Sequence, residues 1–228
     1  MREVARDRVL DDFELAQVLL AARTIGGPYG GIVELLALTG QRREEVACLS
    51  WDEIDLAQKV WTIPKARTKN AKAHIVHLSA QALAALTRAD RNGPLVFTVT
   101  GTKSFQDFSH AKRRIDQLSG VTAWRLHDLR RTCVSGMARL GVAPHIADKI
   151  LNHQAGTISG VAAVYQRHDF LAERRAALDA WGGTSGSHPW RACLRGTNRC
   201  AGGGMKSASS PSRCDGRSIS FQQIVYRF

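Results

Sequence analysis

Two β-prone runs lie between helical segments, and they constrain the fold of this sequence more than any other feature. Residues 60–63 and 74–78 are rich in β-branched and aromatic side chains, and a basic polar turn containing Thr68, Lys69 and Asn70 separates them. Residues 54–56 can add a third strand, so we predict a small three-stranded antiparallel sheet.

Helical periodicity dominates the rest of the sequence up to residue 182, with glycine and proline at the breaks. Gly26, Gly27 and Pro28 interrupt one pattern, and Gly40 ends the next. The first helix is capped by Asp11 or Asp12, and its predicted apolar face consists of Phe13, Leu15, Val18, Leu19 and Ala22. The predicted helices cover residues 10–23, 30–38, 43–49, 80–89, 104–118, 126–140, 144–151, 161–165 and 171–181. The expected fold class is mainly α with a small three-stranded antiparallel β-sheet (α+β).

The composition divides the chain into a predicted domain, residues 1–182, and a tail, residues 183–228. Apolar periodicity stops at Gly182, and the tail is rich in Gly, Ser and Arg, so we expect it to be disordered or foreign to the fold. Of the net charge of +12, the tail carries +6, from seven basic residues and one acidic residue. This charge favours a polyanionic partner, most often nucleic acid.

Several classes of protein are disfavoured by the same composition. No apolar run approaches the roughly 20 residues of a transmembrane helix, and the N-terminus has no signal-peptide core, so we predict a cytoplasmic protein with no membrane partner. The five cysteines form no C-x-x-C pair, which argues against a zinc knuckle or a disulfide framework. Cys48 and Cys133 fall at apolar helical positions and are predicted to be buried. We expect neither a metal nor a cofactor.

Five elements carry candidate chemistry, although each is commonplace alone. His127 and Arg130 are three residues apart and share one face of a predicted helix. Arg42 follows a helix-ending glycine, and Lys69 lies in the hairpin turn. The others are His153, at a helix end, and Tyr165, at an amphipathic position. Taken singly, they read as solvated or core side chains.

Their order and surroundings resemble the tyrosine recombinases, the phage-integrase family. The segment LLALTGQRREEVACLSWDEIDL is similar to the family's first-arginine segment, and TKNAKAHIVHLS to its hairpin-lysine segment. RLHDLRRT, LNH and VYQRHDF are similar to its second-arginine, third-box and nucleophile segments. The resemblance spans roughly residues 8–181 and points to integrases of prophages and genomic islands.

The resemblance implies attack on a DNA phosphodiester without a metal ion. Arg42 and Arg130 would fork onto the non-bridging phosphate oxygens and stabilise the negative charge of the transition state. Tyr165 would be the nucleophile, giving a 3′-phosphotyrosyl link and a free 5′-hydroxyl. Lys69 would protonate the leaving 5′-oxygen, and His127 would accept or help to transfer the tyrosine proton.

Other residues would support this reaction. His153 would donate a hydrogen bond to the phosphate, and Glu45 would orient Arg42 or His127. Asp128 would cap its helix or pair with a nearby base. Contacts to DNA are expected from Arg43, Lys72, Arg131 and Arg167.

The resemblance also implies partners. These are double-stranded DNA at attachment sites, a homotetramer of this chain, and host or phage proteins that bend DNA. Residues 171–181 would pack on a neighbouring subunit, and the protein would associate with the nucleoid when bound to DNA. The exchange of strands would need no ATP.

Two departures from the family pattern stand out. The catalytic pattern begins almost at Met1, so we expect the core-binding domain that usually precedes it to be missing. His77 lies where the family usually has proline in a V-P-L strand motif, which we interpret as a harmless edge-strand substitution. Two alternatives remain open: a catalytically impaired, DNA-binding remnant of an integrase, and a type IB topoisomerase with similar chemistry.

Overall fold

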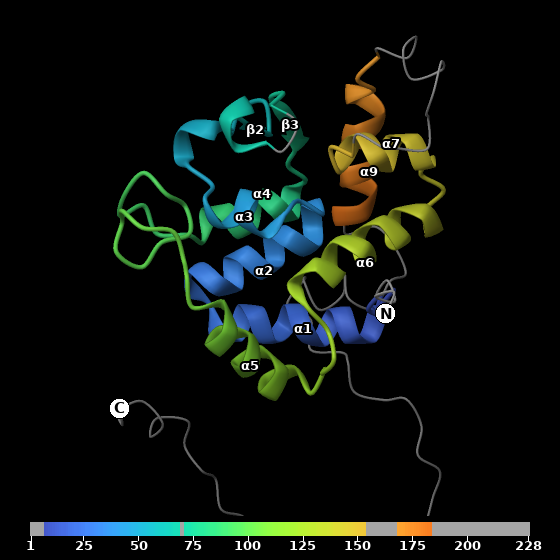
Figure 1. Ribbon diagram of the computed structural model, residues 1–228. Helices are drawn as coiled ribbons and strands as arrows, with labels where there is room; N and C mark the ends of the chain where they lie inside the picture. Colours follow the sequence, from blue (N-terminus) through green and yellow to red (C-terminus); the bar gives the residue numbers. More distant parts are fainter. Residues whose placement is uncertain (1–6, 69–70, 154–167, 184–228) are drawn as a thin grey trace, which may run out of the picture.

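The computed structural model describes residues 7–68, 71–153 and 168–183 of the chain. The elements follow the predicted order of helices, hairpin and helices, as Figure 1 shows. Their bounds are α1 Asp12–Ile25, α2 Gly27–Thr39, α3 Arg43–Ala47, β1 Ile54–Asp55, β2 Val60–Ile63, β3 His74–His77, α4 Ala80–Thr87, α5 Phe108–Ser119, α6 Leu126–Arg139, α7 Pro144–Ile150 and α9 Leu171–Gly182. The predicted fold class is confirmed, and the predicted helix at 161–165 lies outside the described residues.

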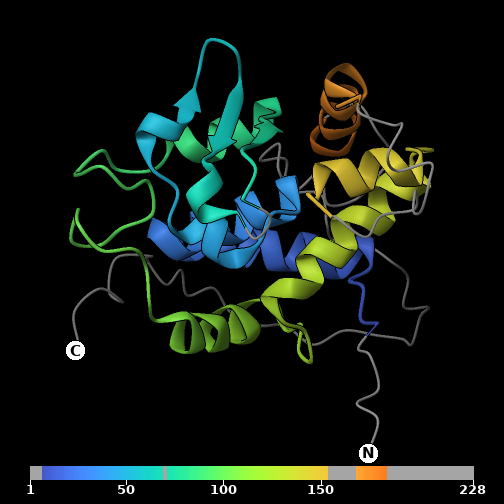
Figure 2. The ribbon, with the colours of Figure 1, turned by 45° about the horizontal axis from the view of Figure 1, so that its top comes forward.

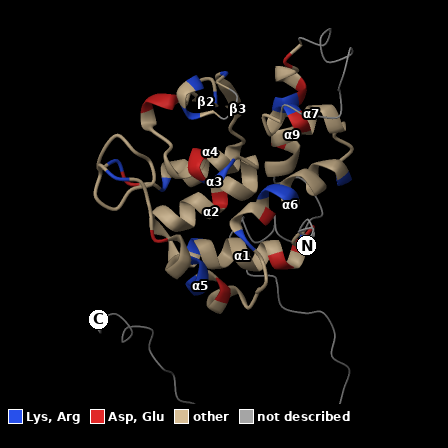
Figure 3. Cartoon of the chain, in the orientation of Figure 1, with Lys and Arg blue, Asp and Glu red and all other residues tan. Residues whose placement is uncertain are grey.

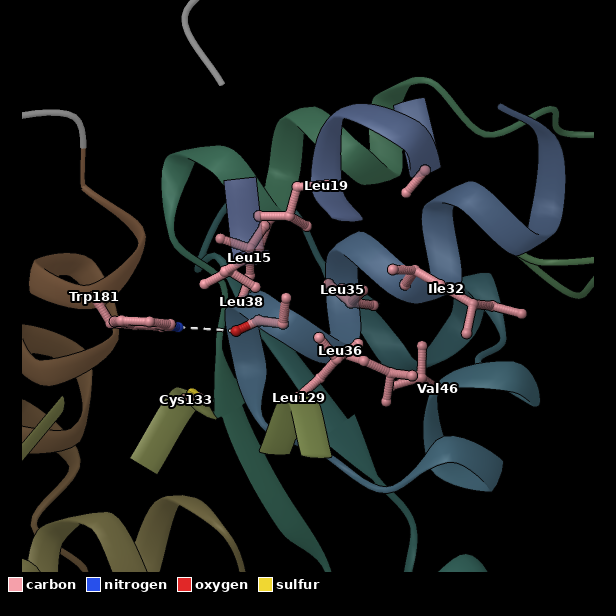
Figure 4. Packing of buried hydrophobic residues seen from close by; sticks show 14 of the residues in the cluster. Leu15, Leu19, Ile32, Leu35, Leu36, Leu38, Val46, Leu129, Cys133 and Trp181 are labelled. Carbon is pink, nitrogen blue, oxygen red and sulfur yellow. Dashed lines mark hydrogen bonds between the residues drawn. The ribbon is translucent and has the colours of Figure 1, made fainter. Parts of the chain in front are cut away.

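Helix α2 forms the centre of the core. It is apolar on nearly every side, which is typical of a helix surrounded by others, and α1, α4, α6 and α9 all pack against it. The indole Nε1 of Trp181 on α9 donates to the carbonyl of Ala37 at 2.9 Å. Figure 4 shows side chains of α1, α2, α6 and α9 in this core, among them Leu15, Leu19, Leu35, Leu36, Leu38, Leu129, Cys133 and Trp181.

The predicted cap of α1 is confirmed, but one residue of its predicted apolar face is not buried. Asp11 accepts from the backbone N–H of Glu14 at 2.8 Å, and Glu14 accepts from that of Asp11 at 3.1 Å. Phe13 is 62% exposed, and Leu20, seven residues further along the helix, is 47% exposed. The buried stripe that faces α2 is made of Leu15, Val18, Leu19 and Ala22, and Phe13 lies off that stripe.

Two predicted helix starts were wrong by three residues or more. Helix α2 begins at Gly27 instead of residue 30, because two consecutive glycines, Gly26 at φ 62° and Gly27 at φ 58°, make the junction. Pro28 fits in the first turn of α2, where no N–H is needed. Helix α5 begins at Phe108 instead of residue 104, because Ser104 forms a β-bridge with Thr98.

The sheet has the order β1-β2-β3, and both pairs are antiparallel, as predicted. Trp61 pairs with Val76 and Ile63 with His74, which places the buried side chains of both strands on the core face. Figures 1 and 2 show the sheet beside the pair formed by α7 and α9. His77, on the edge strand β3, is buried and bonds through Nε2 to Asp179 of α9 at 3.0 Å, so this substitution has a partner of its own.

Helix α9 packs its buried face within its own chain. Its buried residues include Ala177, Leu178 and Trp181, and it contacts α2, α4, α6, α7 and β3. A Cβ placed on Gly136 of α6 would lie 2.0 Å from the Trp181 ring, so the two helices approach closely. The packing of residues 171–181 on a neighbouring subunit stays a prediction, for which the exposed face of α9 remains available.

Two smaller expectations concern burial. Cys133 is buried as predicted, whereas Cys48 is only half-buried.

No helix among the described residues has both the length and the apolar character needed to cross a membrane.

Candidate active site

The turn after α2 brings Arg42 to the surface next to two other helices. Gly40 ends α2 in the left-handed conformation at φ 65°. A Cβ at this position would lie 3.0 Å from Leu151 Cδ2 and 3.2 Å from Cys133 Sγ. Glycine therefore permits both the turn and the close approach of α6 and the end of α7.

Glu45 contacts Arg42, one of the two residues that it was expected to orient. Glu45 Oε1 accepts from Arg42 Nη1 at 2.8 Å, and Oε2 accepts from the backbone N–H of Arg42 at 2.9 Å. The Glu45 side chain is 5% exposed and that of Arg42 is 32% exposed. The Glu45 carboxylate thus holds the Arg42 guanidinium and balances its charge, while part of the guanidinium remains open to solvent.

Arg130 is held differently, by two backbone carbonyls. Its Nη1 donates to the carbonyl of Gly40 and its Nη2 to the carbonyl of Leu151, both at 2.6 Å. The residue is buried, and within the described part of the chain no carboxylate lies within ion-pair distance of it. Of five guanidinium N–H donors, the two carbonyls use two and leave three for a ligand.

Among the described residues, the buried guanidinium of Arg130 therefore has no ion-pair partner. Burial and the neighbouring Arg42 lower the pKa of Arg130 to about 10, although the charge of Glu45 acts in the opposite direction, so the guanidinium remains protonated at neutral pH. A buried cation held only by neutral carbonyls is costly, and an anion that accepts its remaining N–H groups would stabilise it.

His127 lies one turn before Arg130 and is exposed. Partial burial, Arg131 and Arg130 lower its pKa, while Asp128 raises it, so the neutral ring is favoured. Asp128 both caps α6, accepting from the Arg125 N–H at 2.8 Å, and pairs with Arg131 at 2.6 Å. Asp128 therefore fills both roles predicted for it, the cap of its helix and the pairing with a nearby base.

His153 follows the end of α7. Its Nδ1 lies 3.3 Å from Asp148 Oδ1, and its side chain is 43% exposed. Burial and the charge of Arg130 lower its pKa, Asp148 raises it, and Arg42 has a smaller lowering effect. Both Arg130 and Arg42 therefore act on His127 and on His153. We call Arg42, Arg130, His127 and His153 the cradle.

Two residues at the cradle were missed by the sequence reasoning. His74 Nε2 and Gln41 Nε2 each lie 3.0 Å from the carbonyl of Ile150, and Gln41 also donates to Thr39 at 2.9 Å. Burial and the charge of Arg174 lower the pKa of His74 to about 4. Gln41 directly precedes Arg42, but only the fold reveals what either side chain contacts.

Three predicted site residues, Lys69, Tyr165 and Arg167, lie outside the described residues. Next to Lys69 in sequence, Thr68 Oγ1 donates to the carbonyl of Lys72 at 2.7 Å.

The other residues predicted to bind DNA are at the surface. Lys72 and Arg43 are exposed, and the Arg43 guanidinium lies 4.8 Å from the centre of the Phe108 ring. Figure 3 shows basic and acidic residues together at the start of α6. The DNA contacts of Arg43, Lys72 and Arg131 stay predictions.

Across the described ranges, no group of three or more His, Cys, Asp or Glu side chains is placed to hold a metal ion.

Comparison with known proteins finds integrases and recombinases. The model of the Phage integrase family matches residues 8–170. The Prophage integrase IntA of Escherichia coli (strain K12) is 30% identical over 162 residues, which are 65% of this chain. The chain spans 36% of the length of that relative.

Solved structures share the fold at lower sequence identity. An integrase from mycobacterium phage Brujita superposes with a TM-score of 0.60 and 16% identity, over 85% of this chain and 65% of that one. XerA recombinase gives a TM-score of 0.57 and 21% identity, over 71% and 64%. XerH site-specific recombinase, solved in a pre-cleavage complex with its difH substrate, gives 0.54 and 19%, over 64% and 47%.

Proposed function

This chain belongs to the phage integrase family, and on that premise we propose that it cleaves and rejoins DNA at specific sites through a 3′-phosphotyrosyl intermediate. The outcome would be integration or excision of a mobile element. Residues 1–182 would form the catalytic domain, and double-stranded DNA would be the substrate. The XerH relative, described as bound to a difH substrate, supports DNA as the partner.

The observation that carries this proposal is the buried Arg130, which forms no ion pair with any described carboxylate and lies next to Arg42. Two guanidinium groups in one cradle match the two non-bridging oxygens of a phosphodiester. The charge that develops on those oxygens in the transition state would be stabilised by donors already in place. Because Arg130 is fixed by Gly40 and Leu151, little reorganisation would be needed when the phosphate binds.

The proposed reaction exchanges one phosphate ester for another. The phenolic oxygen of Tyr165 bonds to phosphorus, and the bond from phosphorus to the 5′-oxygen breaks. His127 takes the tyrosine proton, for which its lowered pKa and neutral ring suit it, and Lys69 protonates the departing 5′-oxygen. His153 donates to a phosphate oxygen. A 5′-hydroxyl from another strand reverses the steps, with no oxidant, reductant or ATP consumed.

Covalent capture on DNA tests this proposal. The full chain would be incubated with a library of nicked duplexes of randomised sequence, and SDS-resistant adducts would be collected and sequenced. We expect adducts enriched in one sequence with wild type and none with Tyr165→Phe. DNA binding without any adduct would leave the DNA-binding remnant as the better reading, and sequence-independent relaxation of supercoiled plasmid would favour the topoisomerase. Either result would overturn the proposal.

Assembly is a separate part of the proposal. We expect four copies to act on two duplexes, helped by DNA-bending proteins. Since the buried face of α9 is occupied within its own chain, contacts between copies would have to use other surfaces. Light scattering with and without the captured DNA would measure this stoichiometry.

A further inference from the structure

The end of α7 is fixed by side chains from three other parts of the fold. The Ile150 carbonyl lies 3.0 Å from His74 Nε2 of β3 and accepts from Gln41 Nε2, of the turn after α2, at 3.0 Å. The next carbonyl, that of Leu151, accepts from Arg130 of α6 at 2.6 Å. Carbonyls at a helix end have no partner within the helix, so these side chains decide where the end of α7 lies.

His74 is well suited to fix this position. It is the first residue of β3, is buried, and its backbone is paired with Ile63 of the neighbouring strand. A carbonyl can only accept, so Nε2 must carry the hydrogen. Burial and the charge of Arg174 hold the pKa of His74 far below its usual value, so at neutral pH the ring is neutral and its single N–H is committed to Ile150.

The position of Ile150 matters because it is one peptide unit from a carbonyl that orients Arg130. We propose that His74 is a positioning residue of the cradle: its hydrogen bond to Ile150 sets the place of the Leu151 carbonyl, and through it the direction of the three remaining Arg130 donors. The proposal rests on the proposed function only in taking the ligand of the cradle to be a phosphate. His74 touches no reacting atom.

The expected effect is moderate because Ile150 has a second donor. Without the His74 bond, Gln41 still holds the Ile150 carbonyl, so the end of α7 shifts and does not unfold. A misplacement of about 1 Å in a positioned group can cost up to about 100-fold in rate. With one of two donors kept, we expect a loss of about 10-fold in the affinity of the cradle for a phosphate-like anion, near 1.4 kcal/mol for a single hydrogen bond.

The test measures anion binding and not DNA cleavage. Orthovanadate would be titrated into the full chain and followed by ⁵¹V NMR, for wild type, His74→Leu and His74→Gln. Leucine removes the donor, whereas the glutamine Nε2 can still reach a carbonyl. The matched control is His77→Leu, which removes a similarly buried histidine of β3 whose Nε2 bonds to α9 and not to α7.

We expect His74→Leu to bind vanadate about 10-fold more weakly, and His74→Gln and His77→Leu to stay within about twofold of wild type. Equal losses in His74→Leu and His77→Leu would show general loosening of β3 and would overturn the proposal. So would a His74→Gln that binds as weakly as His74→Leu while its circular dichroism is unchanged, or a wild type that binds no vanadate. Because this readout needs no DNA, failure of the adduct assay alone would reject the proposed reaction and leave the role of His74 standing.

Discussion

The two arginines of the cradle belong to regions that hold a positive charge in opposite ways. Arg42 is partly exposed and faces the carboxylate of Glu45, which balances its charge. Arg130 is buried and faces two carbonyls, which orient it without balancing its charge. An incoming anion at Arg42 shares the guanidinium with Glu45, whereas at Arg130 it supplies the missing charge. The same side chain can therefore serve mainly for orientation in one place and mainly for binding in the other.

The largest expected effect is the loss of Arg130. Arg130→Gln should lower the rate of adduct formation by about 10²–10³-fold, the usual consequence of removing a preorganised donor to a developing oxyanion. It also leaves the carbonyls of Gly40 and Leu151 under-satisfied, so unfolding in urea should show a loss of about 1–3 kcal/mol. Arg130→Lys separates these effects, because an ammonium keeps the charge without the fork. Lysine that restores the full rate would contradict the role of the two carbonyls.

Substitutions at two glycines next test whether the cradle and the packing of α6 against α9 can be disturbed independently. Gly40→Ala places a Cβ at φ 65° and 3.0 Å from Leu151, and Gly136→Ala places one 2.0 Å from the Trp181 ring. Both should lose roughly 1–3 kcal/mol in urea unfolding, as strained or overpacked positions do.

Only Gly40→Ala should also weaken vanadate binding by the folded protein, because only Gly40 supplies a carbonyl to Arg130. Equal losses of vanadate affinity in Gly40→Ala and Gly136→Ala would contradict the separation of the two regions.

The pH dependence of stability tests the neutral, buried state of His74, the residue that we propose positions the cradle through Ile150. The pKa of His74 is about 4 in the folded protein, below the ordinary value of 6.5, so between these values the unfolded chain binds more protons. The contribution of His74 to the free energy of unfolding is therefore complete above pH 6.5 and is lost as the pH falls towards 4. The total loss is about 3 kcal/mol.

Urea unfolding of wild type and His74→Gln at pH 7 and pH 4.5 measures this loss. The difference between the two proteins should shrink at the lower pH. A difference that does not change with pH would show that His74 does not titrate in this way.

A smaller effect is expected when Glu45 is neutralised. Glu45→Gln keeps the side-chain shape and removes the negative charge beside Arg42, so vanadate should bind more tightly, by about threefold for a change of roughly 0.7 kcal/mol. Adduct formation should become slower, because Arg42 loses its fixed orientation. Weaker vanadate binding in this variant would mean that Glu45 contributes more through the position of Arg42 than it opposes through its charge.

The smallest effect is expected at Arg131, whose partner Asp128 keeps its cap on α6. Arg131→Ala should cost about 0.5 kcal/mol of stability, as is common for partly exposed ion pairs. If Arg131 also contacts a DNA phosphate, the slope of log affinity against log salt should fall by about 1. An unchanged slope would assign Arg131 to Asp128 alone.

Local features of this fold could be predicted from the sequence, and long-range partners could not. The cap at Asp11, the end of α2 at Gly40 and the pair of Arg42 with Glu45 involve residues at most three apart, where helix geometry fixes the neighbours. Phe13 was misplaced because its apolar character does not say which side of α1 meets α2.

The partners of Arg130 illustrate the limit most clearly. Its carbonyl acceptor at Gly40 is 90 residues away in the chain, and His74 is 76 residues from Ile150. No spacing in the sequence encodes such pairs, because packing of α2, α6, α7 and β3 creates them. The order of the motifs thus pointed to the candidate site, while the contacts that hold Arg130 appeared only in three dimensions.

The most direct measurement is the vanadate affinity of Arg130→Gln compared with Arg42→Gln, determined on folded full-length protein. Because Arg130 is buried and pairs with no described carboxylate, whereas Arg42 pairs with Glu45, we expect the loss of Arg130 to weaken binding by at least about 10-fold more than the loss of Arg42. Equal losses, or a larger loss at Arg42, would contradict the assignment of anion binding to the buried arginine.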